Sequence, residues 1–295
     1  MTQDYIIRAM TTNKELRAVA VRSTDAVNHA QQAHQTTPVA TAALGRALTG
    51  GLIVGNLVKS GMEISLDIMG DGPLKRIIVN ANYKGEVRGY VSNPNIDFIK
   101  NEAGKLDVAQ AVGKGYLTIK KDLGIKEPYT GSVPLISGEI AEDLTYYFTK
   151  SEQTPSAVGL GVLVDTDLSV KAAGGFLVQL LPDASEETIS RLEENLAEIK
   201  SISALIEKGL TPEEILEKLL DGFEFRVLEQ ADVKFKCKCN RDRIAALATS
   251  LGEDEIRDIL EEQGKVEIRC HFCNQSYQFD EENIEEILAK SKEDN

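Results

Sequence analysis

This chain has few of the residues that most often act as metal ligands or nucleophiles, and few large aromatic residues. Among its 295 residues there is no tryptophan, and there are only three histidines and four cysteines. The sequence contains no G-x-S-x-G, no H-E-x-x-H and no phosphate-binding loop ending in Gly-Lys-Ser or Gly-Lys-Thr. Those patterns mark common hydrolase, metalloprotease and nucleotide-binding sites. Their absence leaves no recognisable catalytic set, and we expect that the protein is not an enzyme.

An excess of positive charge is also missing. The formal net charge is −14, which argues against a general affinity for nucleic acid or for an anionic membrane. The N-terminus lacks the basic segment and apolar run of a signal peptide, and the longest apolar stretch, residues 50–58, is too short to cross a bilayer. We therefore predict a cytoplasmic protein. In that compartment thiols stay reduced, so paired cysteines point to metal or redox chemistry rather than to structural disulfides.

Residues 1–182 mix the two hydrophobic periods of strands and helices. The two kinds of element do not alternate strictly, so we predict an α+β core domain with a mixed sheet rather than a doubly wound fold. Thr24-Asp25 and Thr37-Pro38 are good helix starts. We interpret Gly159-Leu160-Gly161 as a turn, and Tyr146, Tyr147 and Phe148 as core packing. The predicted strands cover residues 15–23, 62–70, 74–81, 86–91 and 115–120, with a final hairpin at 156–167 and 170–182, and the predicted helices cover 24–34, 38–48 and 138–150.

The composition changes after Pro182. Residues 183–220 contain ten acidic residues against four basic ones. Apolar residues recur there at helical spacing, and Thr211-Pro212 gives a second helix start. We predict a helical acidic linker over 183–231, with short amphipathic helices whose acidic faces are exposed. This segment is either a fixed connector or one whose apolar stripe can dock and detach.

The last segment, residues 232–295, holds all four cysteines. Cys237 and Cys239 form a CxC pair, and Cys270 and Cys273 form a CxxC pair 30 residues further on. Two such pairs brought together by a small fold are typical of a four-thiolate zinc site, although CxC is unusual and the spacer is long for a zinc ribbon. We predict a small zinc-binding α+β module. Its predicted strands cover residues 232–237, 265–270 and 276–280, and its predicted helices cover 240–251, 252–264 and 281–291.

The size of this module supports a bound metal. A domain of about 65 residues has a small hydrophobic core and usually needs a disulfide or a structural metal to stay folded. Structural zinc supplies roughly 10–16 kcal/mol of apparent binding energy, which matches or exceeds the total stability of a typical domain. The plainer alternative is four buried, unlinked cysteines. The pairing of all four makes it the weaker hypothesis.

The surroundings of the cysteines narrow their chemistry. A closed four-sulfur site has no open position for water, so catalytic zinc is not expected. A thioredoxin-like role needs a CxxC at the start of a helix, whereas Cys270 follows a strand. A nucleic-acid contact is weighed lower, because acidic helices share the module, and His271 is expected at the surface rather than as a ligand. Six basic residues would offset the anionic centre and keep the sulfurs ionised: Lys234, Lys236, Lys238, Arg241, Arg243 and Arg269.

Two roles remain, a permanently structural zinc and a switch. Each cysteine has a neighbour one or three positions away, so Cys237 with Cys239 and Cys270 with Cys273 could form two local disulfides. Both would close very small loops and would constrain the unfolded chain little. On the switch hypothesis, oxidation removes the zinc, the module unfolds and apolar surface becomes free to bind other proteins.

Several segments together resemble a known family. They are "GDGPL" at 70–74, "VRGYV" at 87–91, "AAGGFLVQLLP" at 172–182, and "FKCKCNRDR" at 235–243 with the distal "RCHFC". On these the chain resembles the bacterial redox-regulated heat-shock chaperonins of thirty-three kilodaltons, over nearly its whole length. One departure is Asn240 after the second cysteine, where the family more often has serine.

The resemblance implies an ATP-independent holdase chaperone of the oxidative stress response. It implies one Zn²⁺ held by Cys237, Cys239, Cys270 and Cys273 in a reduced, inactive form. Oxidant and heat would form the two local disulfides, release zinc and unfold module and linker. The active form would bind unfolding client proteins and would tend to form a homodimer. The resemblance implies no nucleic-acid or membrane partner.

Two other functions stay open on the residues alone. The first is a constitutive zinc-ribbon adaptor that binds nucleic acid or protein, and the second is a thiol oxidoreductase. The client surface is not fixed by the sequence. The apolar stripe of the linker is one candidate, with patches on the core as others. The apolar stripe of the linker comprises Leu192, Leu196, Ile199 and Leu205.

The order of disulfide formation is also not fixed by the sequence. We expect Cys270 and Cys273 to pair first, because a CxxC closes with less strain than a CxC.

Overall fold

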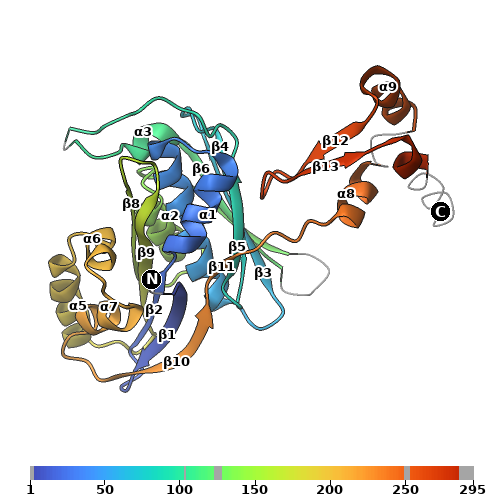
Figure 1. Cartoon of the computed structure of the whole chain (residues 1–295). Helices are drawn as coiled ribbons and strands as arrows, with labels where there is room; N and C mark the ends of the chain where they lie inside the picture. Colours follow the sequence, from blue (N-terminus) through green and yellow to red (C-terminus); the bar gives the residue numbers. More distant parts are fainter. Residues whose placement is uncertain (1–2, 103, 123–127, 249–252, 286–295) are drawn as a thin grey trace. The chain divides into compact units, whose positions relative to one another are not determined.

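The structure, a computed structural model, describes all residues except 1–2, 103, 123–127, 249–252 and 286–295. The chain forms two compact units, residues 1–236 and residues 237–295. The first contains two sheets and most of the helices, and the second contains a two-stranded sheet with helices (Figure 1). The predicted α+β class is confirmed.

A five-stranded antiparallel sheet forms one layer of the first unit. Its strand order is β10-β1-β2-β9-β8. The central strand β2 places five of its seven residues in the interior, as expected for a sheet covered on both faces. The bounds are β1 Tyr5–Thr11, β2 Leu16–Arg22, β8 Ser156–Val164, β9 Val170–Leu180 and β10 Phe225–Asp232.

A six-stranded mixed sheet forms the second layer, in the order β11-β5-β4-β3-β6-β7. Only the short β11 runs parallel to its neighbour β5. The inner strands alternate buried and half-buried residues with period two, so one face packs on the core and the other faces water. The bounds are β3 Glu63–Gly70, β4 Arg76–Asn82, β5 Glu86–Val91, β6 Gly115–Asp122, β7 Tyr129–Pro134 and β11 Lys234–Phe235.

Helix α2, Pro38–Leu57, is the centre of the main core. It is long and apolar enough to cross a membrane by length and composition alone, but most of it is buried inside the unit. Thr37 precedes it and Pro38 occupies its first turn, as the sequence predicted. Tyr147 and Phe148 of α4 are fully buried in the same core, so their predicted packing role is confirmed. Three further helices contribute to this core: α1 Thr24–His34, α3 Val108–Val112 and α4 Ala141–Lys150.

Three amphipathic helices cover the other face of the five-stranded sheet (Figure 1). They are α5 Glu186–Glu198, α6 Ile202–Glu207 and α7 Pro212–Leu219. Leu192, Ile206 and Leu216 are buried against the sheet, while most of the acidic residues are exposed. The predicted amphipathic helices are therefore present. The division into core, linker and module concerns which segments unfold together, and it stays a prediction.

Several elements differ from the sequence interpretation. Strands β1 and β7 and helix α3 were not predicted, and the linker predicted as helical ends in a strand. Residues 225–232 form β10, which was not predicted, and which pairs with β1 along its length. The interpretation of Gly159-Leu160-Gly161 as a turn is wrong, because these residues lie inside β8. A Cβ atom at Gly159 would lie 2.3 Å from the Phe176 ring, and one at Gly161 would lie 2.6 Å from the backbone nitrogen of Ser203. The glycines therefore permit close packing rather than a change of direction.

The second unit has a small core around a hairpin. Strands β12 and β13 pair in antiparallel register. The predicted helices are found at α8 and α9, while the closing helix is described only from 281 to 285, and its remaining residues lie outside the described part. The bounds are α8 Arg241–Ala248, α9 Glu253–Gln263, β12 Val266–Arg269 and β13 Ser276–Phe279.

Candidate metal centre

The first cysteine pair lies on the stretch that leads into α8. Cys237 and Cys239 follow β11 without regular structure of their own. Asn240 ends this stretch, and its side-chain oxygen accepts the N–H of Arg243 at 2.8 Å. This N-cap bond fixes the start of α8. The cysteines are thus presented by a short segment anchored immediately behind them.

The second pair lies on the turn between β12 and β13. The N–H of Asn274 donates to the carbonyl of Cys270 at 2.8 Å, and the N–H of Cys270 donates to the carbonyl of Gln275 at 2.9 Å. Asn274 has a φ of 59°, the left-handed conformation that asparagine tolerates better than most residues. These bonds close the tight turn that contains both Cys270 and Cys273.

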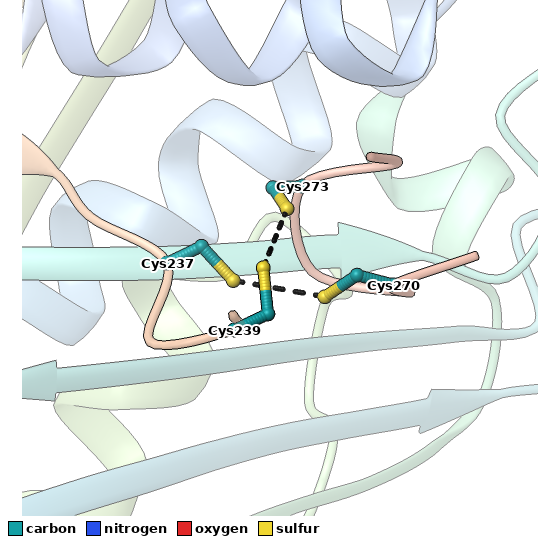
Figure 2. A group of neighbouring side chains, drawn as sticks. All are labelled: Cys237, Cys239, Cys270 and Cys273. Atoms are coloured by element: carbon teal, nitrogen blue, oxygen red, sulfur yellow. Dashed lines mark hydrogen bonds between the residues drawn. The ribbon is translucent and has the colours of Figure 1, made fainter. Parts of the chain in front are cut away.

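The four sulfur atoms converge on one point (Figure 2). All four Sγ atoms lie within 4.8 Å of one another. Cys237 Sγ is 3.6 Å from Cys270 Sγ, and Cys239 Sγ is 3.3 Å from Cys273 Sγ. All four are free thiols. Sulfurs at the corners of a tetrahedron with Zn–S bonds of 2.3 Å are about 3.8 Å apart, so the arrangement fits zinc.

The core beneath the sulfurs is small. Among the described residues of this unit, seven side chains form the buried cluster, and Cys270 is one of them. The other three cysteines pack against it, half-buried. A cluster of this size gives little hydrophobic stabilisation. The members are Ile244, Ile256, Val266, Cys270, Tyr277, Phe279 and Ile284.

The electrostatic environment differs among the thiols. Burial raises the pKa of Cys237 and of Cys273. Burial also opposes ionisation of Cys239, but hydrogen bonds from Tyr277 and the other thiols outweigh it and lower the pKa of Cys239 to about 7. The Tyr277 hydroxyl donates to Cys239 Sγ at 3.3 Å. The sequence analysis missed Tyr277, because a tyrosine in a strand gives no signal of its partner.

Most of the six basic residues that the sequence placed around the cysteines have other partners. Burial and interactions with the other thiols, Tyr277 and the backbone are the main causes of the pKa shifts of Cys237, Cys239 and Cys273. Five of the six basic side chains instead contact other groups: Lys234 pairs with Asp232, Lys236 with Glu86, Arg241 with Asn283, Arg243 with the Lys238 carbonyl, and Arg269 with Glu267. Their predicted role in keeping the sulfurs ionised stays a prediction. His271 is exposed and lies outside the sulfur cluster, as expected.

The chain is similar to known proteins over nearly its whole length. The model of the Hsp33 protein family matches residues 4–280. The chain is 51% identical to a 33 kDa chaperonin of Geobacillus kaustophilus and 50% identical to one of Desulforamulus reducens, covering 99% of each chain. A crystal structure of the 33 kDa chaperonin from Thermotoga maritima, described as a heat shock protein 33 homolog, superposes with a TM-score of 0.93 at 40% identity and full coverage of both chains. The chain therefore belongs to the Hsp33 family.

Proposed function

We propose that this protein is a redox-regulated, ATP-independent holdase chaperone whose reduced, zinc-bound form is inactive. One observation carries the proposal: the four cysteines of the sequence place their Sγ atoms within 4.8 Å of one another. The relatives named 33 kDa chaperonin support a heat-shock chaperone in the same family. Membership in a chaperonin family also supports a binding role rather than catalysis.

Zinc is the metal that the donor set fits best. Four thiolates are soft ligands that favour zinc with tetrahedral geometry. Cys237, Cys239, Cys270 and Cys273 would hold one Zn²⁺, and the closed sulfur set makes its role structural. Bound zinc would supply the binding energy that folds the small unit.

Oxidation would remove this support. Two thiolates and one peroxide, with two protons, give one disulfide and two water molecules, so the sulfurs lose two electrons and peroxide gains them. We propose the local pairs Cys237–Cys239 and Cys270–Cys273, each on one short segment. Disulfides between a cysteine of the CxC and one of the CxxC would join segments more than thirty residues apart, and would keep the unit cross-linked. Local pairs leave the hairpin and α8 unconnected once zinc is gone.

The unfolding would spread to the linker, residues 183–231. Helices α5 to α7 bury apolar side chains against the five-stranded sheet, so their release would expose apolar surface on both partners. Clients would bind to this surface, with the linker stripe of Leu192, Leu196, Ile199 and Leu205 as one part. The homodimer of the active form, the cytoplasmic location and the absence of nucleic-acid and membrane partners are further parts of the proposal.

The test follows three signals in one sample. Reduced, zinc-loaded protein is treated with peroxide at raised temperature, and zinc release, helicity and suppression of client aggregation are recorded together. We expect the three to change together, and mass spectrometry should find the two local disulfides. Release of zinc without suppression of aggregation would contradict the switch. Full activity of the reduced form would contradict it as well, and client binding only while zinc is bound would identify an adaptor.

A further inference from the structure

One edge strand of the five-stranded sheet, β8, carries no charge and no proline, and its one irregularity in register lies at its end, between Leu163 and Val164. Within the described chain, β8 ends the sheet and pairs with β9 alone. Its nine residues, SAVGLGVLV, include no charged residue and no proline, whereas the opposite edge strand β10 carries Arg226, Glu229 and Asp232. Charge, proline or a covering element usually blocks an edge, because unpaired N–H and C=O groups recruit further strands. β8 therefore offers a template for strand addition.

Only part of this edge is covered. The N–H of Val158 donates to the Thr145 hydroxyl of α4 at 3.1 Å. In an antiparallel ladder every second residue directs its N–H and C=O to the same side, so Leu160 and Val162 also direct theirs toward this edge. Thr145 thus satisfies the outward N–H of Val158. The edge from Leu160 onward continues without such a cap among the described residues.

A groove of about 740 Å³ follows this uncapped part. The floor is β8 from Leu160 to Val164, and the walls come from the start of α2, from α6 and from the loop around Phe98. Val162 packs toward Gly45 of α2, and Gly161 allows Ser203 of α6 to approach closely. β8 therefore lies between two helices (Figure 1), with its edge turned to the groove.

The groove combines apolar side chains with positive charge. Phe98 is 58% exposed and Leu168 is 44% exposed, and both line the groove. Two charged lining residues are already paired, Arg46 with Glu139 and Asp165 with Lys171. The other charged lining residues are three exposed lysines and one glutamate, in a chain of net charge −14: Lys100, Lys105, Lys200 and Glu207.

We propose that this groove binds an extended segment of an unfolding client, in which apolar side chains alternate with carboxylates, as an added strand on β8. Main-chain hydrogen bonds to Leu160 and Val162 would supply affinity, and the lysines would select acidic segments. A second copy of this chain is disfavoured as the occupant, because pairing two β8 edges would oppose two basic rims. The inference rests on the proposed holdase function and names the chemistry of its client.

The same geometry connects the groove to the switch. Helix α6 belongs to the linker that we propose to unfold, whereas β8, α2 and the loop with Lys100 and Lys105 belong to the proposed core domain. Release of α6 would remove one wall and free the face of β8 at Gly161. The groove should therefore bind extended segments more tightly in the oxidised form than in the reduced form.

The binding test uses two fluorescent seven-residue peptides and the full-length oxidised chain. One alternates valine with glutamate, and the other alternates valine with lysine. Fluorescence anisotropy should show tighter binding of the glutamate peptide. Val162→Pro removes the outward N–H without breaking a ladder bond, and should weaken this binding about three- to tenfold, the equivalent of one lost hydrogen bond. Val162→Ala loses the valine packing but keeps the N–H, and should bind as the unmodified chain does.

A charge exchange tests the choice of client. The double variant Lys100→Glu with Lys105→Glu should reverse the peptide preference. Lys14→Glu with Lys75→Glu changes the same charge at exposed positions outside the groove, and should leave the preference unchanged. A reversed preference requires the variant to bind the lysine peptide more tightly than the glutamate peptide, and a misfolded variant would not gain such binding.

The outcomes separate this inference from the holdase proposal. If the oxidised chain fails to suppress aggregation of thermally unfolding luciferase, the holdase proposal fails. If it suppresses aggregation but binds the two peptides equally, or if Val162→Pro and Val162→Ala behave alike, the groove proposal alone is overturned. Loss of self-association in Val162→Pro with unchanged peptide binding would also overturn it, and would assign the edge to a second copy of the chain.

Discussion

At the scale of single residues, the four thiols share one centre but not one environment. Cys239 is the thiol that accepts the Tyr277 hydroxyl, and its pKa is about 7, whereas burial raises the pKa values of Cys237 and Cys273. The cysteine spacing could be interpreted from the sequence because thiolate ligands come in close pairs. Tyr277 could not, because its contact depends on how β13 lies against the CxC segment.

Tyr277→Phe should weaken zinc binding. The substitution removes the donor to Cys239 while the ring stays in the small core. Loss of a hydrogen bond to a metal ligand typically lowers metal affinity by tenfold or more, so we expect about a tenfold loss. Competition with a chromophoric chelator under reducing conditions measures it. Tyr116→Phe, at an exposed tyrosine of the first unit, is the control, and equal affinities in both variants would contradict the role of Tyr277.

Asp4 should make the stability of the first unit depend on pH. Burial raises the pKa of Asp4 to about 6, against the opposing hydrogen bond from the Ala26 N–H and the field of Arg22. The folded pKa exceeds the unfolded one, so the folded chain binds the extra proton. The corresponding stability is fully present below pH 4 and is lost as the pH rises through about 6, a change of about 3 kcal/mol.

The measurement for Asp4 compares two chains. The free energy of unfolding by guanidinium is recorded for the unmodified chain and for Asp4→Asn at several pH values, and the difference between them is taken. Titrations common to both chains, including those of the thiols, cancel in this difference. We expect it to change between pH 4 and 7 in favour of Asp4→Asn. A constant difference would show that Asp4 titrates alike in the folded and unfolded chains.

At the scale of elements, local signals were predicted well and distant partners poorly. Thr37-Pro38 and Thr211-Pro212 start helices where expected, because caps depend on a few adjacent residues. The strand at 225–232 was missed because all eight of its residues are half-buried or exposed on an edge, which leaves no alternation of buried and exposed positions. Its partner β1 is also more than two hundred residues away. Gly159 and Gly161 were misinterpreted for the same reason, since the atoms that require a glycine there belong to Phe176 of β9 and Ser203 of α6.

Thr211→Ala should loosen the linker. The Thr211 hydroxyl accepts the N–H of Glu214 at 3.2 Å, and the Glu214 carboxylate accepts the N–H of Thr211 at 2.8 Å. Loss of such a cap costs about 1 kcal/mol. We expect faster hydrogen exchange in α7, and activation by peroxide at a lower temperature. Thr166→Ala, in the exposed turn after β8, is the control, and if α7 exchange is unchanged in Thr211→Ala the cap does not limit local opening.

At the scale of the whole molecule, the two units differ in what holds them together. The first unit has two sheets with buried apolar residues on both faces of its five-stranded sheet. The second has a buried cluster of seven side chains among its described residues, and four thiols placed to share a metal. A large core gives stability by burial alone, whereas a thin one depends on its ligand. The second unit, the proposed sensor, is therefore expected to lose its fold without its ligand while the large core of the first unit stays folded.

Zinc removal under reducing conditions tests this difference directly. A strong chelator with excess thiol should unfold residues 237–285 and leave the strands of the proposed core domain folded. Hydrogen exchange with mass spectrometry should show lost protection in α8, β12 and β13 and retained protection in β2, β3 and β9, and zinc added back should restore it. Retained protection in β12 and β13 without zinc would mean that the seven-residue cluster suffices. In that case thiol oxidation, rather than loss of the metal, would have to be the event that unfolds the unit.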